Sequence, residues 1–109
     1  MSKLKILLDE CLDRRLASEI PGFYIKTVVQ MGWAGLTNGK LLTNAQVHFD
    51  VFITSDKNLS FQNNLGKYKI AVIVLCPVRN QIEDLQLLIP SLLKVLSSPL
   101  KSKPVFVRP

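Results

Sequence analysis

The sequence has little of what builds disulfide-stapled, zinc-bound or membrane-spanning proteins. It contains two cysteines, Cys11 and Cys76, and a single histidine, His48. Two cysteines are too few for a disulfide framework or a four-ligand zinc site. No apolar run approaches the roughly 18 to 20 residues that a membrane span needs, and no signal peptide precedes the first apolar run. We therefore expect a cytoplasmic protein with no membrane partner and with both cysteines as thiols.

Acidic residues are also scarce relative to basic ones. Eight Asp and Glu against 14 Lys and Arg give a net charge of +6. This balance favours a polyanionic partner such as RNA or DNA, or an acidic protein, but it also describes a solvated surface that happens to be basic. The length of 109 residues suits one domain, and 48% hydrophobic residues can build a core. We expect a single domain over residues 1–109, with a linker and an edge strand in 97–109.

Short apolar runs alternate along the chain with segments of helical periodicity. Strands are expected at 4–8, 23–29, 50–54, 70–75 and 105–107, and helices at 12–20, 38–45, 58–65 and 82–96. Asn38 is placed to cap the second helix, and Asn80 with Glu83 has the spacing of a capping box. Pro90 should kink or split the last helix. The alternation predicts an α/β fold, a three-layer α/β/α sandwich around a mostly parallel sheet of four to five strands.

Two of these strands end directly in acids. Asp9 and Glu10 follow the first strand, and Asp56 follows the third through Thr54 and Ser55. Parallel strands place their carboxyl ends at one edge of the sheet, where ligands bind in open α/β folds, so Asp9 and Asp56 should converge. Asp50 begins the third strand and is expected at the opposite edge, roughly 20 Å away.

Carboxylates that converge in this way repel one another unless a cation lies between them. Hard oxygen ligands select Mg²⁺ or Mn²⁺, so Asp9, Asp56 and Glu10 are the candidate metal ligands. Such an ion can orient a water for attack on a phosphodiester. A basic rim would hold the nucleic-acid backbone, and the candidates near this edge are Arg14, Arg15, Lys40 and Lys57. Each acid taken alone also suits the cap of the helix that follows it.

Six segments between about Leu4 and Leu96 carry a family pattern. They read LLDECLDRRL, MGWAGLTNGKLL, FDVFITSDKNL, FQNNL, IAVIVL and RNQIEDL. Together they resemble a group of small bacterial PIN-like proteins. The resemblance implies an α/β/α sandwich, Mg²⁺- or Mn²⁺-dependent ribonuclease activity and a site of several acids, among them Asp9 and Asp56. It also implies a toxin-like role, an antitoxin-like protein as a partner, and a homodimer.

The sequence departs from this family at one part of the expected site. PIN nucleases usually carry an acid at the start of the helix after the second strand, where this chain has Asn38, and related proteins show one two residues later, where it has Lys40. Two hypotheses follow. The first is a metal-dependent ribonuclease whose catalytic residues are Asp9, Asp56, Glu10 and Asn38, with Asn38 as a neutral oxygen donor. The second is an eroded PIN-like module that binds RNA or a protein without turnover.

Two other features of the sequence leave alternatives open. Receiver domains also carry acids after the first and third strands, but they need a Lys-Pro pair after the fifth, whereas Lys103 and Pro104 precede the last expected strand.

Trp33 lies in a glycine-containing loop and either stacks on a base or, as we prefer, covers the core or a subunit contact. Cys11 has no evident reactive partner in the sequence.

Overall fold

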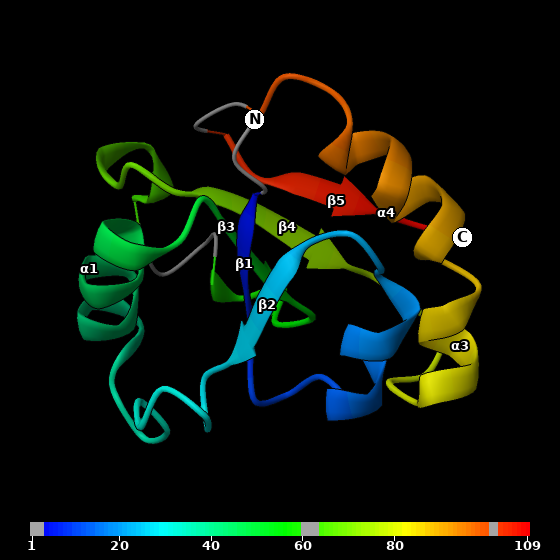
Figure 1. Ribbon diagram of the computed structural model, residues 1–109, viewed down its shortest axis with the longest axis horizontal. Coiled ribbons are helices and arrows are strands. Elements are labelled where there is room, and N and C mark those ends of the chain that lie inside the picture. Colours follow the sequence, from blue (N-terminus) through cyan, green and yellow to red (C-terminus); the bar gives the residue numbers. More distant parts are fainter. Residues whose placement is uncertain (1–3, 60–63, 101–102) are drawn as a thin grey trace.

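Five short parallel strands form the sheet at the centre of the protein. The computed structural model describes residues 4–59, 64–100 and 103–109 (Figure 1). The strands are β1 (Lys5–Leu8), β2 (Tyr24–Thr27), β3 (Val51–Thr54), β4 (Ala71–Leu75) and β5 (Val105–Val107). They pair in the order β2-β1-β3-β4-β5, and every pair is parallel. The predicted α/β fold is confirmed, and β5 is an edge strand as expected.

The central strands β1, β3 and β4 are largely buried because both faces of the sheet are covered. All four residues of β3 are buried, as is usual for a parallel strand with helices on both sides. Successive side chains point to opposite faces, so Val51 and Ile53 enter one hydrophobic cluster while Phe52 enters the other. Figure 1 shows α1 on one side of the sheet, with α3 and α4 on the other. Two such clusters are what a three-layer arrangement produces.

The connection between β1 and β2 contains a short 3-10 helix, η1 (Arg14–Glu19), within the helix predicted over 12–20. Its N-cap is Asp13, whose side chain accepts the backbone N–H of Arg15. The prediction was right about the buried face, since Leu16 and Ile20 are almost fully buried. The predicted bounds were too wide, and 3-10 turns are frequent in short connectors.

The helix α1 (Asn38–His48) follows β2 and packs on the second cluster. Its N-cap is Thr37, whose hydroxyl accepts the backbone N–H of Lys40 at 3.4 Å. Asn38 is therefore the first helical residue and not the cap, so that prediction was wrong by one position. Trp33 is half-buried beside this helix, with its ring 6.1 Å from the ring of Phe49, and covers the core as preferred above.

The last predicted helix is divided into α3 (Ile82–Gln86) and α4 (Ile89–Leu96). Pro90 lies in the first turn of α4, where its missing N–H is not needed, so the predicted split is confirmed. The capping box was wrong: the N-cap of α3 is Gln81, without a side-chain bond. The helix expected over 58–65 falls largely on residues 60–63, which lie outside the described residues, and a short 3-10 turn, η2 (Leu65–Lys67), follows.

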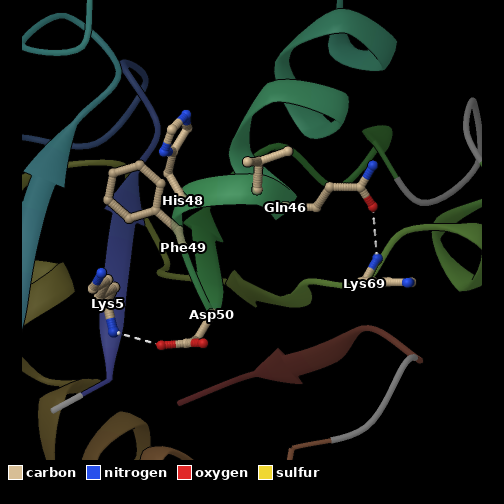
Figure 2. Close-up of a pocket in the computed structure, with 7 residues that line it drawn as sticks. Lys5, Gln46, His48, Phe49, Asp50 and Lys69 are labelled. Atoms are coloured by element: carbon tan, nitrogen blue, oxygen red, sulfur yellow. Dashed lines mark hydrogen bonds between the residues drawn. The ribbon is translucent and has the colours of Figure 1, made fainter. Parts of the chain in front are cut away.

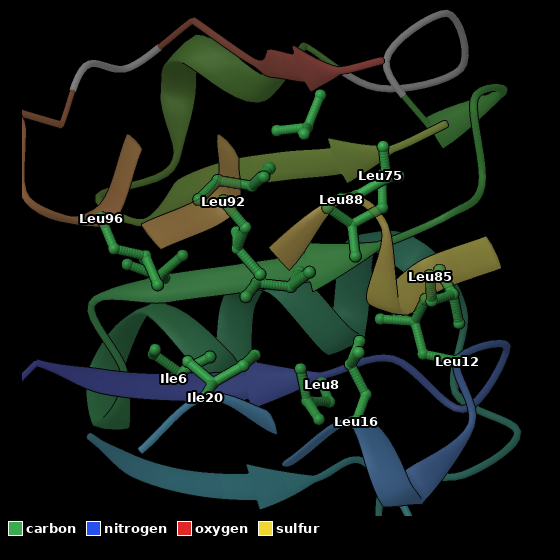
Figure 3. Close-up of a cluster of buried hydrophobic side chains, with 14 of the residues drawn as sticks. Ile6, Leu8, Leu12, Leu16, Ile20, Leu75, Leu85, Leu88, Leu92 and Leu96 are labelled. Atoms are coloured by element: carbon green, nitrogen blue, oxygen red, sulfur yellow. The ribbon is translucent and has the colours of Figure 1, made fainter. Parts of the chain in front are cut away.

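The larger hydrophobic cluster joins β1, β3 and β4 to η1, α3 and α4 (Figure 3). The apolar residues of the two helices interlock with the strands because they recur on one helical face. Leu85, Leu88 and Leu92 are at most 2% exposed. Within the described ranges, no helix has the length and apolar character that crossing a membrane would require.

The strand order places a topological switch point between β1 and β3. From β1 the chain moves to β2 at one edge and then returns to β3 on the other side of β1. In doubly wound sheets the crevice beyond the carboxyl ends of such strands is where ligands bind. Lys103 and Pro104 precede β5 in the chain, so the Lys-Pro arrangement of a receiver domain is not formed.

Candidate functional site

Asp9 lies directly beyond β1, and several hydrogen bonds hold its backbone and its carboxylate. Its backbone N–H donates to the carbonyl of Ile53 at 2.9 Å, which extends the β1–β3 pairing by one residue. Its Oδ1 accepts the backbone N–H of Glu10 at 2.8 Å, and its Oδ2 accepts the hydroxyl of Thr54 at 2.7 Å. The carboxylate of Asp9 is therefore fixed in position at the switch point.

The hydroxyl of Thr54 connects the two acids that the sequence predicts to converge. Thr54 is the last residue of β3 and is fully buried. Its Oγ1 donates to Asp9 Oδ2 and accepts the backbone N–H of Asp56 at 3.0 Å. A buried hydroxyl is costly unless it is hydrogen-bonded. The structure thus brings Asp9, through its carboxylate, and Asp56, through its backbone N–H, to the same buried hydroxyl, and Asp9 lies 45 residues from Thr54 in the sequence.

Asp56 also organises the loop that follows β3. Its Oδ1 accepts the backbone N–H of Asn58 at 2.9 Å, and its carbonyl accepts the N–H of Leu59 at 3.3 Å. This is the local turn that an Asp side chain commonly stabilises. Asp56 therefore stabilises its own loop, the local role that its position in the sequence also allowed. It also shares the hydroxyl of Thr54 with Asp9.

Cys11 is a member of this site that the sequence did not indicate. Its Sγ lies 3.4 Å from Asp9 Oδ2, and it accepts the hydroxyl of Ser55 at 3.2 Å. The side chain of Asn80 donates to the backbone carbonyl of Cys11 at 2.8 Å and so brings the β4–α3 connection to the same edge. In the sequence, the only indication that Cys11 belongs to the site is its position two residues after Asp9. Its other partners come from chain segments that are distant in the sequence.

Glu10 extends the site toward β2 and away from Asp56. It is exposed, and together with Asp9 and Arg14 it lines a cavity of about 520 Å³ between η1 and β2. The remaining lining of this cavity is Leu12, Ala17, Ile25, Thr27, Val29 and Gln30. Glu10 and Arg14 therefore share one cavity with Asp9.

The other predicted residues lie around this edge of the sheet. Asn38 is half-buried at the start of α1, and no hydrogen bond joins it to Asp9, Glu10 or Asp56 in the described part of the chain. Lys40 lies in the first turn of α1, and Lys57 directly follows Asp56. Both lysines are exposed.

Arg15 is engaged by a neighbour on its own segment. Its guanidinium contacts Asp13 at 2.7 Å, and its Nε donates to both carboxylate oxygens at 3.1 and 3.2 Å. The hydrogen bonds from Arg15 lower the pKa of Asp13 to about 2, and the same pairing raises the pKa of Arg15. Of the two neighbouring arginines, Arg14 is the one that lines the cavity at the site.

The donor atoms at this edge suit a hard divalent cation, although they form only a small set. Within the described ranges, no three or more His, Cys, Asp or Glu side chains are grouped as metal ligands. Mg²⁺, however, is commonly bound through one or two carboxylates together with waters and substrate phosphates. Asp9 follows β1 and Asp56 follows β3 beyond Ser55, and these two strands are adjacent. Asp9 and Asp56 supply the two carboxylates available here.

The opposite edge of the sheet carries a different arrangement (Figure 2). Asp50 lies there, as predicted, and its Oδ2 accepts the backbone N–H of Lys5 at 2.9 Å. Gln46 Oε1 accepts the backbone N–H of Lys69, also at 2.9 Å. A cavity of about 340 Å³ opens between these residues and His48. Its two polar contacts both satisfy backbone groups at the start of strands.

Comparison with known proteins gave no match: no family model, no curated protein and no solved structure is similar to this chain at a significant level.

Proposed function

We propose that this protein is a metal-dependent ribonuclease of the PIN-like kind, and the toxin-like component of a toxin–antitoxin pair. The observation that carries the proposal is the pair of acids at the switch point: the hydroxyl of Thr54 donates to the carboxylate of Asp9 and accepts the backbone N–H of Asp56. Two fixed carboxylates at the ligand-binding edge of a basic protein suit a phosphodiester substrate.

The residues divide into those that hold the reaction centre and those that bind the backbone. Asp9 and Asp56 hold a Mg²⁺ or Mn²⁺ ion, and Glu10 assists from the β2 side. When bound, the ion supplies an activated water and neutralises the charge that develops on the phosphate. Thr54 orients the carboxylate of Asp9, and Asn38 positions substrate at the start of α1. The positive charges around this edge attract the RNA backbone, and they belong to Arg14, Arg15, Lys40 and Lys57.

A second function, RNA or protein binding without turnover, is favoured by one specific observation. Both oxygens of Asp9 already accept hydrogen bonds, from the backbone of Glu10 and from Thr54. Asn38 and Lys40 stand where an acid would complete the metal site. In this alternative the same edge is an eroded site, and binding depends on salt but not on metal.

The partners and location follow from the proposed role. We propose a cytoplasmic protein that acts as a homodimer and is neutralised by an antitoxin-like protein. Size-exclusion chromatography with light scattering tests the dimer. A mass near one chain at micromolar concentration would contradict it.

Cleavage of a mixed, structured RNA pool with added Mn²⁺ or Mg²⁺ tests the function. The parent should cut the pool, and Asp9→Asn/Asp56→Asn should cut it more than roughly 100-fold more slowly, since even outer-shell partners of a metal site contribute 10- to 100-fold. Asp50→Asn is the matched control, because it makes the same kind of substitution at one acid of the opposite edge and keeps an oxygen that accepts the Lys5 N–H. It should cut like the parent.

Two results would decide against the nuclease. If the folded parent cuts nothing with metal present, the binding module replaces it. If the double variant cuts as fast as Asp50→Asn, the cutting does not come from this site.

A further inference from the structure

We propose that the cavity between η1 and β2 is a subsite for one unpaired nucleobase of single-stranded RNA, next to the acids at the switch point. The inference rests on the proposed function for its substrate class. It assigns a role to residues that neither the sequence pattern nor the acid pair involves, chiefly Ala17, Thr27, Val29 and Gln30.

The size and lining of the cavity suit one nucleoside. Its volume of about 520 Å³ lies within the range of small-molecule sites, roughly 300 to 1,000 Å³. Its apolar wall is aliphatic and is formed by Leu12, Ala17, Ile25 and Val29. Val29 is 62% exposed and lies on this wall. A flat base laid against this wall would cover that surface.

The polar groups of the cavity favour the uncharged part of a nucleotide over a free anion. Asp9 and Glu10 line one side, and two carboxylates repel a phosphate placed among them. Arg14 is the only basic residue in the lining. A base inside the cavity with its phosphate at Arg14 matches this distribution of charge, whereas inorganic phosphate inside the cavity does not.

Gln30 presents hydrogen-bond donors that the protein does not use. Its Oε1 accepts the backbone N–H of Thr27 at 2.8 Å, which fixes the orientation of the amide because only the oxygen can accept. The hydroxyl of Thr27 accepts the N–H of Gln30 at 3.1 Å, which leaves its own proton to donate. In the described part of the chain no partner takes the Nε2 hydrogens. Carbonyl oxygens and ring nitrogens of a base are suitable acceptors.

The position of the cavity relative to Asp9 links it to the reaction centre. Asp9 lines the cavity on the β2 side of β1 and accepts the Thr54 hydroxyl on the β3 side. A base in the cavity therefore lies next to Asp9, one of the two acids at the switch point. Bases can be splayed into a protein only from single strands, loops or ends, so duplex RNA should not use this subsite.

The test is RNA binding by the full chain in EDTA, where cleavage is absent. A fluorescently labelled 12-nucleotide RNA is titrated by anisotropy, once as a single strand and once as a duplex with its complement. Gln30→Glu keeps the oxygen that accepts the Thr27 N–H but removes the amide donors. It should weaken single-strand binding by roughly three- to tenfold, the contribution of one hydrogen bond.

The matched control is Gln46→Glu at the opposite edge. Gln46 also uses its Oε1 to accept a backbone N–H, that of Lys69, so the change in charge and the retained hydrogen bond are the same. It should weaken single-strand and duplex binding by the same small factor. If Gln30→Glu behaves like Gln46→Glu, the proposal is overturned.

Ala17→Phe fills the cavity and should lower single-strand affinity while duplex affinity stays at the parent value. If this half-buried position does not tolerate Phe, Gln30→Glu decides alone, because Gln30 is exposed. If Gln30→Glu loses single-strand affinity selectively but the parent never cuts RNA, the subsite is supported and the nuclease proposal is wrong. If the parent cuts RNA with metal but Gln30→Glu shows no selective loss of affinity, the nuclease proposal is supported and the subsite is wrong.

Discussion

The two edges of the sheet both carry an aspartate beside β1 and β3, but they use it differently. At the amino edge Asp50 accepts one backbone N–H, that of Lys5. At the carboxyl edge Asp9 accepts a hydrogen bond from the buried hydroxyl of Thr54, which in turn accepts the backbone N–H of Asp56. The first contact completes strand pairing, whereas the second fixes a side chain relative to another loop. An acid whose position is fixed by a buried side chain is the stronger candidate for chemistry.

The largest effect on stability is expected at the hydroxyl that defines the carboxyl edge. Thr54→Val keeps the shape of the side chain but leaves Asp9 Oδ2 and the Asp56 N–H without this partner. The free energy of unfolding should fall by about 2 kcal/mol, the cost of leaving buried polar groups unsatisfied. Urea denaturation measures it.

Thr43→Val is the control for that substitution. Thr43 is exposed, and its hydroxyl donates to the carbonyl of Gly39 within α1. The change in unfolding free energy should stay within about 0.5 kcal/mol. A Thr54→Val protein as stable as the control would show that the hydroxyl does not hold the site together.

A smaller effect is expected at the amino edge. Asp50→Ala removes the acceptor of the Lys5 N–H and should cost about 1 kcal/mol, a typical net value for one hydrogen bond. Asp50→Asn should cost less because its amide oxygen still accepts. The same urea denaturation compares them. If Asp50→Ala lost as much unfolding free energy as Thr54→Val, the contacts at the two edges would not differ in how much they stabilise the protein.

The smallest effect is expected where a contact is local and exposed, at Asp13 and Arg15 on η1. The pKa of Asp13 is lowered from 3.8 to about 2 in the folded protein. Its stabilising contribution is therefore present above pH 3.8 and is lost as the pH falls from 3.8 to about 2. Thermal unfolding should show that the melting temperature falls slightly less between pH 5 and pH 2.5 in Arg15→Gln than in the parent. An equal loss in both proteins would contradict this.

The sequence predicted the strands and the shared edge because those depend on local patterns. Short apolar runs indicate buried strands, and acids directly after two parallel strands must lie at one edge. It could not predict that Cys11 contacts Ser55 or that Asn80 reaches Cys11, since both contacts depend on the strand order and on loop conformation. The prediction that Asn38 caps α1 was wrong for a local reason, because Thr37 beside it is also a good cap residue.

The all-parallel sheet also has a consequence for how the protein folds. Parallel neighbours cannot be joined by a tight hairpin, so each strand pair requires a crossover connection before it can form. Asp9 meets Thr54 only after β1 and β3 have paired across 45 residues of chain. Contacts this distant in sequence are associated with slow folding, because loop-closure entropy is lost before the contact is gained. During synthesis the contact between Asp9 and Thr54 cannot form until β3, at Val51–Thr54 of the 109-residue chain, has been made.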